Sequence, residues 1–259
     1  MNTRQPAVSG LFYPDDAREL ACEVDTLLRQ EQREVVPNLR ALIVPHAGYI
    51  YSGSVAAAAY SCIPHDSPFK YILLIGPSHR VAFQGMAVPL ADQFNTPLGN
   101  IAIAADRVSE LVDKGFVSYN DLAHRQEHSL EVQLPFIQQI DIKADLIPVV
   151  VGNATASEVG KIILPALQDS EVLTVISTDL SHYHSYVQAK LIDENTNKRI
   201  IDGDTDIRGD EACGYMGLNG LLLALASTDL KPHLLQTSNS GDSAGDKARV
   251  VGYGAYAIY

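Results

Sequence analysis

Three histidines in this sequence each follow an apolar run of the kind that forms a buried strand. His46 ends ALIVPH, His79 ends YILLIGPSH, and His182 ends VLTVISTDLSH. Runs this rich in aliphatic and β-branched residues, closed by turn residues, are typical of strands that are buried on both faces. In an open α/β sheet, ligands bind outside the carboxyl ends of the strands. We therefore expect three imidazoles from three separate strands to converge on one site.

Two imidazoles and one carboxylate, with open coordination positions, form the ligand set that non-haem Fe(II) uses in oxygen chemistry. In this hypothesis His46 and His79 supply the nitrogens. The carboxylate must then come from another loop at the same edge of the sheet. Asp242 is the first candidate, because it lies in a polar, glycine-rich link between two β-rich runs. Asp246 and Asp179 are the alternatives.

The remaining candidate site residues would act around such a metal. His182 is available as a general acid or base, because the unperturbed pKa of histidine lies near neutrality. Asp179 stands three residues before it and would orient it. His128 and Glu127 are expected near the cleft, where they would support the ligands. Tyr49 is expected either to pack in the core or to line the cleft.

Three other patterns in the sequence allow different chemistry. His124 and His128 are four residues apart near the start of a helical stripe within 121–140, so they could chelate a metal from one helix face, although a solvated helix start is the simpler interpretation. Ser243 lies in GDSAG, which matches the G-x-S-x-G pattern of serine hydrolases. That pattern needs a helix after the serine and a later histidine, yet a β-rich run follows and no histidine does. Cys213 could be a thiol nucleophile, but a small buried cysteine at a helix start is the ordinary case.

The order of the apolar runs predicts the architecture. Strand-like runs alternate with segments whose apolar residues recur at helical spacing, which is typical of α/β proteins. The predicted strands are 41–46, 71–79, 144–152, 172–182, 232–237 and 248–258, and the predicted helices are 17–32, 52–61, 106–114, 157–167, 186–201 and 214–226. Residue 15 or 16, both aspartates, would cap the first helix. We expect one three-layer αβα domain over 1–259, with a central mixed sheet.

Composition narrows the classes of partner. The chain has 259 residues, of which 46% are hydrophobic and 19% charged, so it can bury a substantial core. A net charge of −12 argues against binding to a nucleic-acid backbone. No apolar stretch reaches the roughly 18 residues that a membrane span needs. Three scattered cysteines and an N-terminus without an apolar signal region favour a reducing cytoplasm.

Five motifs together resemble a known family. PHAGYIYSG, GPSH, EHSLEVQLPF, STDLSHY and SGD…GD…VVGY occur in this order, and the sequence is similar to the Memo family (mediator of ErbB2-driven cell motility) over nearly its whole length. Bacterial and archaeal members are also called AmmeMemoRadiSam system protein B. The resemblance implies the fold of the class III extradiol dioxygenases (LigB-like), which hold non-haem Fe(II) with two histidines and a glutamate.

The resemblance also implies roles for particular residues. His46 and His79 correspond to the metal pair, and His182 to the catalytic histidine of the dioxygenases. Asp242 stands where some animal members have a cysteine, and a hard carboxylate there favours Fe(II), Mn(II) or Zn(II) over Cu(I). We therefore expect Fe(II), with Zn(II), Mn(II) or Cu as alternatives, in a dioxygenase-like oxidoreductase.

A second class of function uses the same cleft. Animal members have been regarded as signalling proteins that bind phosphotyrosine-containing peptides. By that analogy, the chain would be a binding module that holds a peptide or a small acidic ligand without turnover.

Overall fold

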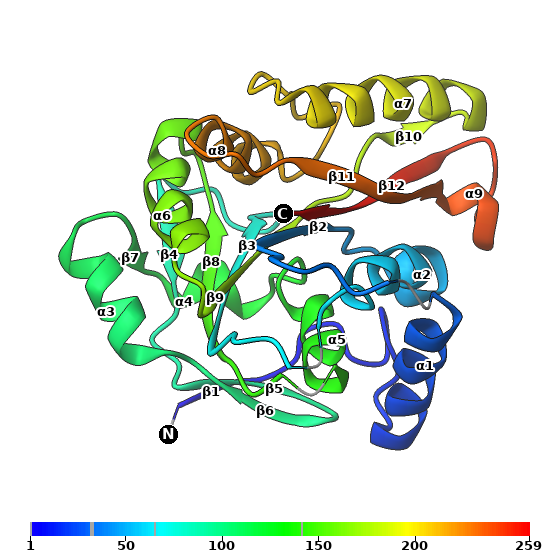
Figure 1. The fold of residues 1–259 in the computed structure, drawn as a ribbon. Coiled ribbons are helices and arrows are strands. Elements are labelled where there is room, and N and C mark those ends of the chain that lie inside the picture. Colours follow the sequence, from blue (N-terminus) through cyan, green and yellow to red (C-terminus); the bar gives the residue numbers. More distant parts are fainter. Residues whose placement is uncertain (1, 32–33, 65, 141) are drawn as a thin grey trace.

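A mixed sheet runs through the centre of this computed structural model, which describes residues 2–31, 34–64, 66–140 and 142–259 (Figure 1). Within these residues the sheet has nine strands in the order β10-β12-β2-β9-β3-β8-β4-β7, and β11 also pairs with β12. The strands are β2 (Ala41–Val44), β3 (Tyr71–Pro77), β4 (Met86–Val88), β7 (Ser118–Tyr119), β8 (Asp145–Val151), β9 (Val172–Ser177), β10 (His182–His184), β11 (Pro232–Asn239) and β12 (Val250–Ile258). A smaller sheet pairs β1 (Thr3–Arg4), β5 (Gln93–Thr96) and β6 (Gly99–Ala102).

The four central strands β2, β9, β3 and β8 are parallel, and they are the apolar runs that the sequence predicts. Nearly all of their residues are buried, as expected for strands covered on both faces. Val44 pairs with Ser177, and Ile176 pairs with Ile75. The carboxyl ends of β2, β9 and β3 are therefore level, and the residues that follow them emerge at the same edge of the sheet.

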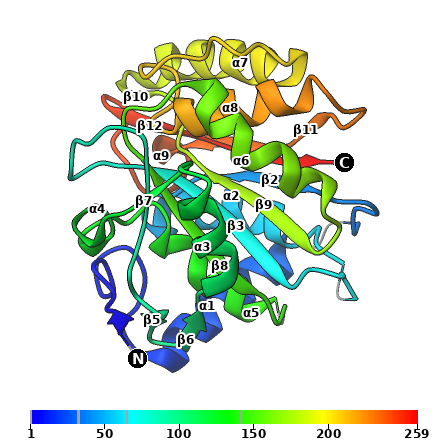
Figure 2. The same cartoon turned by 90° about the vertical axis from the view of Figure 1, so that its left-hand side faces the viewer.

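Helices cover both faces of the sheet, which gives three layers (Figures 1 and 2). On one face lie α6 (Ala156–Gln168), α7 (Tyr186–Asp202) and α8 (Tyr215–Leu225), and on the other lies α2 (Tyr49–Tyr60), backed by α1 (Ala17–Gln30) and α5 (Leu134–Gln139). The other helices of the described residues are α3 (Ala105–Asp113), α4 (Asp121–Arg125), the short 3₁₀ helix η1 (Glu131–Gln133) and α9 (Ser240–Ser243). The mixed α/β architecture is as predicted. None of the helices described is long and apolar enough to cross a membrane.

The largest differences from the predicted helices are at α2, which begins at Tyr49 rather than at residue 52, and within 121–140. Asp16 caps α1 by accepting hydrogen bonds from two backbone N–H groups, while the predicted helix end at residue 32 lies outside the described residues. The helical stripe within 121–140 is interrupted between α4 and η1. Here the Glu127 carboxylate accepts hydrogen bonds from the backbone of His128 and Ser129, and such bonds compete with helical ones. This break turns the segment 126–130 toward the end of β3.

Candidate metal centre

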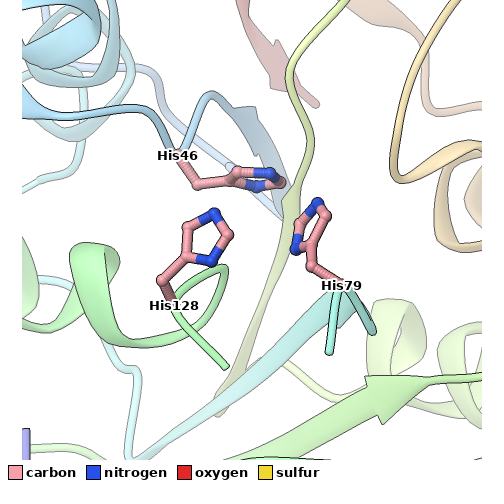
Figure 3. A group of neighbouring side chains, drawn as sticks. All are labelled: His46, His79 and His128. Atoms are coloured by element: carbon pink, nitrogen blue, oxygen red, sulfur yellow. The ribbon is translucent and has the colours of Figure 1, made fainter. Parts of the chain in front are cut away.

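His46, His79 and His128 face one another at the carboxyl ends of the central strands (Figure 3). Their ring centroids are separated by 5.1 Å (His46–His79), 5.4 Å (His46–His128) and 4.6 Å (His79–His128). One nitrogen from each ring lies within 4.8 Å of the others, so the three could hold one ion after a small approach. His46 follows β2, His79 follows β3, and His128 comes from the break between α4 and η1.

The tautomer of His46 is set by a buried hydrogen-bond network. The Ser177 hydroxyl has one proton, which it donates to the carbonyl of Ser129 (2.6 Å), and it accepts a hydrogen bond from Gln133 Nε2 (3.0 Å). His46 Nδ1 lies 2.9 Å from the same hydroxyl and must therefore be the donor. This leaves the lone pair on His46 Nε2, which is the form that binds a metal.

Glu127 orients the imidazole of His79 and lies close to that of His128. Its carboxylate is buried and accepts hydrogen bonds from both His79 Nδ1 (2.8 Å) and the His79 backbone N–H (2.6 Å). Burial by itself would raise the pKa of Glu127, but the hydrogen bonds and charge of His79 lower it to about 2. Because an ionised carboxylate can only accept, His79 Nδ1 is the donor, and Nε2 is the nitrogen that a metal would bind. His128 Nδ1 is buried, 3.4 Å from the same carboxylate, and it has no hydrogen-bond partner.

Burial holds His46 and His128 in the neutral state that metal binding requires. Burial, reinforced by His79, His128 and His182, lowers the pKa of His46 well below its ordinary value. Burial also lowers the pKa of His128 to about 4. Neutral imidazoles are good ligands for Fe, Zn and Cu, so the donor set fits a transition metal.

The Ser177 network leads to a test. In the Ser177→Ala variant, His46 Nδ1 loses its acceptor, and we expect metal affinity to fall by about 10- to 100-fold. Thr174→Val is the matched control, because Thr174 is buried on the same strand and its hydroxyl has no partner. Its affinity should stay within about 2-fold of the wild type. Competition against a chromophoric chelator measures both values, and equal affinities would show that Ser177 does not orient His46.

The structure does not bring Asp242, the predicted carboxylate ligand, into this group. Its Oδ1 accepts a hydrogen bond from the hydroxyl of Tyr186 (2.6 Å), and its Oδ2 accepts one from the backbone N–H of Asn239 (3.0 Å). The reason is local: the link before β12 forms the short helix α9, and Asp242 belongs to the capping box at its start. His128 occupies the third position of the group instead.

A cavity of about 740 Å³ opens over the three histidines. Asp179 and His182 also line it, as does Asp246, which the sequence suggests as an alternative carboxylate. Leu11 and Ile50 line it as well and are largely exposed, so its entrance is partly apolar. A cavity of this size is typical of a small-molecule site.

His182 is oriented by the backbone rather than by Asp179, contrary to the sequence hypothesis. His182 Nδ1 donates to the carbonyl of Leu180 (2.8 Å), so a lone pair remains on Nε2. The Asp179 carboxyl instead accepts a hydrogen bond from the His46 backbone N–H (2.7 Å). Burial raises the pKa of Asp179 to about 7, against the opposing effect of that hydrogen bond. Asp179 therefore secures the turn that carries His46.

Other residues that the sequence offers as candidates have structural roles. Tyr49 is buried and its hydroxyl donates to the backbone of η1 (2.7 Å), whereas Tyr51 lines the cavity. The Nε2 of His124 lies 3.0 Å from a backbone carbonyl of β4, and His124 is not part of the three-histidine group. The hydroxyl of Ser243 donates to the carbonyl of Ser240 (3.3 Å), and Ser243 ends α9, so no helix of the hydrolase type follows it.

Several residues of the site are not evident from the sequence. Ser129 and Gln133 lie in the EHSLEVQ motif, and Ser177 begins the STD motif, yet only the fold shows that they meet at His46. Cys213, the possible thiol nucleophile, also lies beside this group. Its Sγ is 3.2 Å from His46 Nε2, and burial raises the pKa of its thiol to about 12, which disfavours the thiolate.

The fold and the site define an α/β protein with a candidate metal centre at the carboxyl ends of its parallel strands. A family model described as "Memo-like protein" matches residues 4–257. The chain belongs to the Memo family. Similar relatives, each described as a MEMO1 family protein, occur in Aquifex aeolicus (34% identical, covering 98% of both chains), Methanosarcina mazei (33%, 100% of both) and Metallosphaera sedula (31%, 96% of this chain and 97% of the relative).

Proposed function

We propose that this protein is a non-haem metal-dependent oxidoreductase whose metal, Fe(II), is held by His46, His79 and His128. The observation that carries the proposal is the convergence of three imidazoles, two of which have Nδ1 engaged in a hydrogen bond, so that Nε2 is the nitrogen left to bind a metal. We further propose that residues 1–259 form one domain of the class III extradiol dioxygenase (LigB-like) type. The scattered cysteines support a cytoplasmic location.

The ligand set bears on the choice of metal. Imidazole suits Fe, Zn and Cu, whereas Mn(II) is better suited by oxygen ligands, so a third ligand from His128 rather than Asp242 disfavours Mn(II). Three protein ligands would leave coordination positions of the ion open for exogenous ligands. When bound, Fe(II) supplies one-electron and dioxygen chemistry.

The surrounding side chains bind and handle protons. His182 has its Nδ1 held by Leu180, and burial lowers the pKa of His182, so its Nε2 is available to accept a proton from a substrate in the cavity. Asp179 acts as a positioning residue, because it holds the backbone of His46. Leu11 and Ile50 at the entrance would exclude water from a bound substrate.

The cavity also supports a second candidate, a module that binds a peptide or small acidic ligand without turnover. Arg249 lines the cavity and lies 5.0 Å from the ring of Tyr183, which is largely exposed beside it. A cation next to an exposed aromatic ring would suit an acidic ligand with an apolar part.

One experiment separates the two candidates. The protein is purified without oxygen, loaded with Fe(II), analysed for iron, and then given oxygen with catechol as the probe substrate. The oxidoreductase is supported if one iron binds per chain and oxygen uptake exceeds that of the His182→Ala variant. Stoichiometric iron without oxygen uptake favours the binding module. Absence of stoichiometric metal contradicts the proposed centre.

A further inference from the structure

A second cavity, of about 530 Å³, lies beside the metal cavity at the ends of β3 and β8. Its walls come from the segment after β3, the end of β8 and the first turn of α8, and they include Phe83, Val151, Tyr215 and Met216. We call it the side chamber. Nothing in the proposed metal chemistry uses it.

The lining of the side chamber favours an uncharged ligand. None of the described residues that line it carries a charged side chain, although 19% of the chain is charged. Three of its polar side chains bond within the wall: the Ser78 hydroxyl donates to the carbonyl of Val81 (2.6 Å), and Asn153 Nδ2 donates to Gln84 Oε1 (2.9 Å). Burying an apolar group here would therefore gain free energy, and it would leave these two hydrogen bonds intact.

The walls of the side chamber are fixed in place. The Asn153 backbone N–H donates to the carbonyl of Phe83 (2.8 Å), and the Gly152 backbone N–H donates to the carbonyl of Gly85 (2.9 Å). A Cβ at Gly152 would lie 2.4 Å from the Phe83 carbonyl oxygen, so glycine is needed for this close approach. A preformed cavity loses little conformational entropy when a ligand binds.

Cys213 connects the side chamber to the metal centre. This residue lines both cavities, and its Sγ lies 3.2 Å from His46 Nε2. On the other side, Ser78 lines the side chamber, while the next residue, His79, belongs to the metal group. Only the side chain of Cys213 would thus separate a ligand atom at the metal centre from the side chamber.

We propose that the side chamber binds an uncharged, apolar part of the substrate, while the polar end of the same molecule reaches the metal centre. The apolar part would be about the size of a single ring or of two fused rings. This inference rests on the proposed function, because it assigns a substrate class to that site. The proposal depends on two observations: the side chamber has an uncharged lining, and Cys213 lines both this chamber and the metal cavity.

The test uses probes with and without a ring system on protein loaded with Zn(II), which is not oxidised. The probes are 2-naphthohydroxamic acid, acetohydroxamic acid, which has the same metal-binding group without the rings, and 2-naphthol, which lacks that group. Val81→Trp and Met216→Trp fill the side chamber from two different walls, and neither residue is fully buried. Leu223→Trp adds the same ring to an exposed position of α8 as a control.

We expect 2-naphthohydroxamic acid to bind the wild type and the Leu223→Trp variant at least about 10-fold more tightly than acetohydroxamic acid, by calorimetry. This preference should disappear in the two filled variants. If it persists in a folded filled variant, the proposal is overturned.

Binding of 2-naphthol to metal-free protein tests the side chamber independently of the metal centre. If it binds the wild type and the filled variants equally, the side chamber is not its site, whatever the metal does. A different result is that the filled variants no longer bind 2-naphthol, while neither hydroxamate binds the Zn(II)-loaded wild type. That result would contradict the proposed metal centre. The shared-substrate proposal then fails with it, and the side chamber remains as a separate apolar site.

Discussion

Replacing His128 by alanine should abolish stoichiometric metal binding, whereas Asp242→Asn should leave it intact. His128 supplies one of three converging imidazoles, and removing a ligand should weaken affinity by more than the roughly 10- to 100-fold that the loss of a supporting hydrogen bond costs. Asp242 instead caps α9 and binds the Tyr186 hydroxyl. Metal content after anaerobic loading and dialysis measures the effect, with His79→Ala as a positive control for loss.

The opposite result would restore the ligand set suggested by the sequence. If Asp242→Asn lost the metal while His128→Ala retained it, the link before β12 would have to rearrange when the ion binds. Far-ultraviolet circular dichroism of each variant shows whether loss of metal reflects loss of the fold. Because the amide oxygen that Asp242→Asn introduces can still accept a hydrogen bond, α9 should survive this change.

Glu131→Ala should lower the free energy of unfolding by about 3–5 kcal/mol, because it removes the carboxylate that pairs with the buried Arg4 guanidinium. The Glu131 carboxylate is fully buried. It pairs with the Arg4 guanidinium, and it accepts hydrogen bonds from the Tyr13 hydroxyl (2.7 Å) and from the backbone N–H groups of Ala7 (2.7 Å) and Val8 (2.9 Å). One side chain thus attaches the N-terminal segment to η1.

The same substitution should also weaken metal binding. Arg4 donates to the backbone carbonyls of Glu127 (2.6 Å) and His124 (3.1 Å), and so it braces the segment that presents His128. Urea unfolding followed by circular dichroism measures stability. Glu110→Ala serves as the control, because Glu110 forms an exposed pair with Lys114 on α3 and such pairs contribute little. Equal unfolding midpoints for the two variants would contradict the proposed role of Glu131.

The parts of the fold that followed from local pattern were predictable. The runs that became β2, β3, β8 and β9 are mostly apolar, and a parallel strand covered on both faces requires such a run. His46 and His79 come directly after two of these strands. Because parallel strands share a direction, their carboxyl ends meet at one edge, and the proximity of these two side chains was implied by the sequence.

The third position of the metal group was decided only by the tertiary structure. The spacing around His128 looks helical, and nothing local shows that Glu127 will bind the backbone of His79, 48 residues away. The place of Asp242 was also decided by the tertiary structure, since its partners Asn239 and Tyr186 are available only once α9 has formed beside α7.

The sequence by itself determined the α/β class, the family and the two histidines at the strand ends, because these depend on residue order and periodicity along the chain. The fold decided which third group joins them, which nitrogen of His46 and of His79 is held by a hydrogen bond, and which backbone carbonyl orients His182. Those features depend on contacts between residues that are distant in the chain or on the direction of single hydrogen bonds. A linear pattern does not specify such contacts, because many pairings are compatible with the same local preferences.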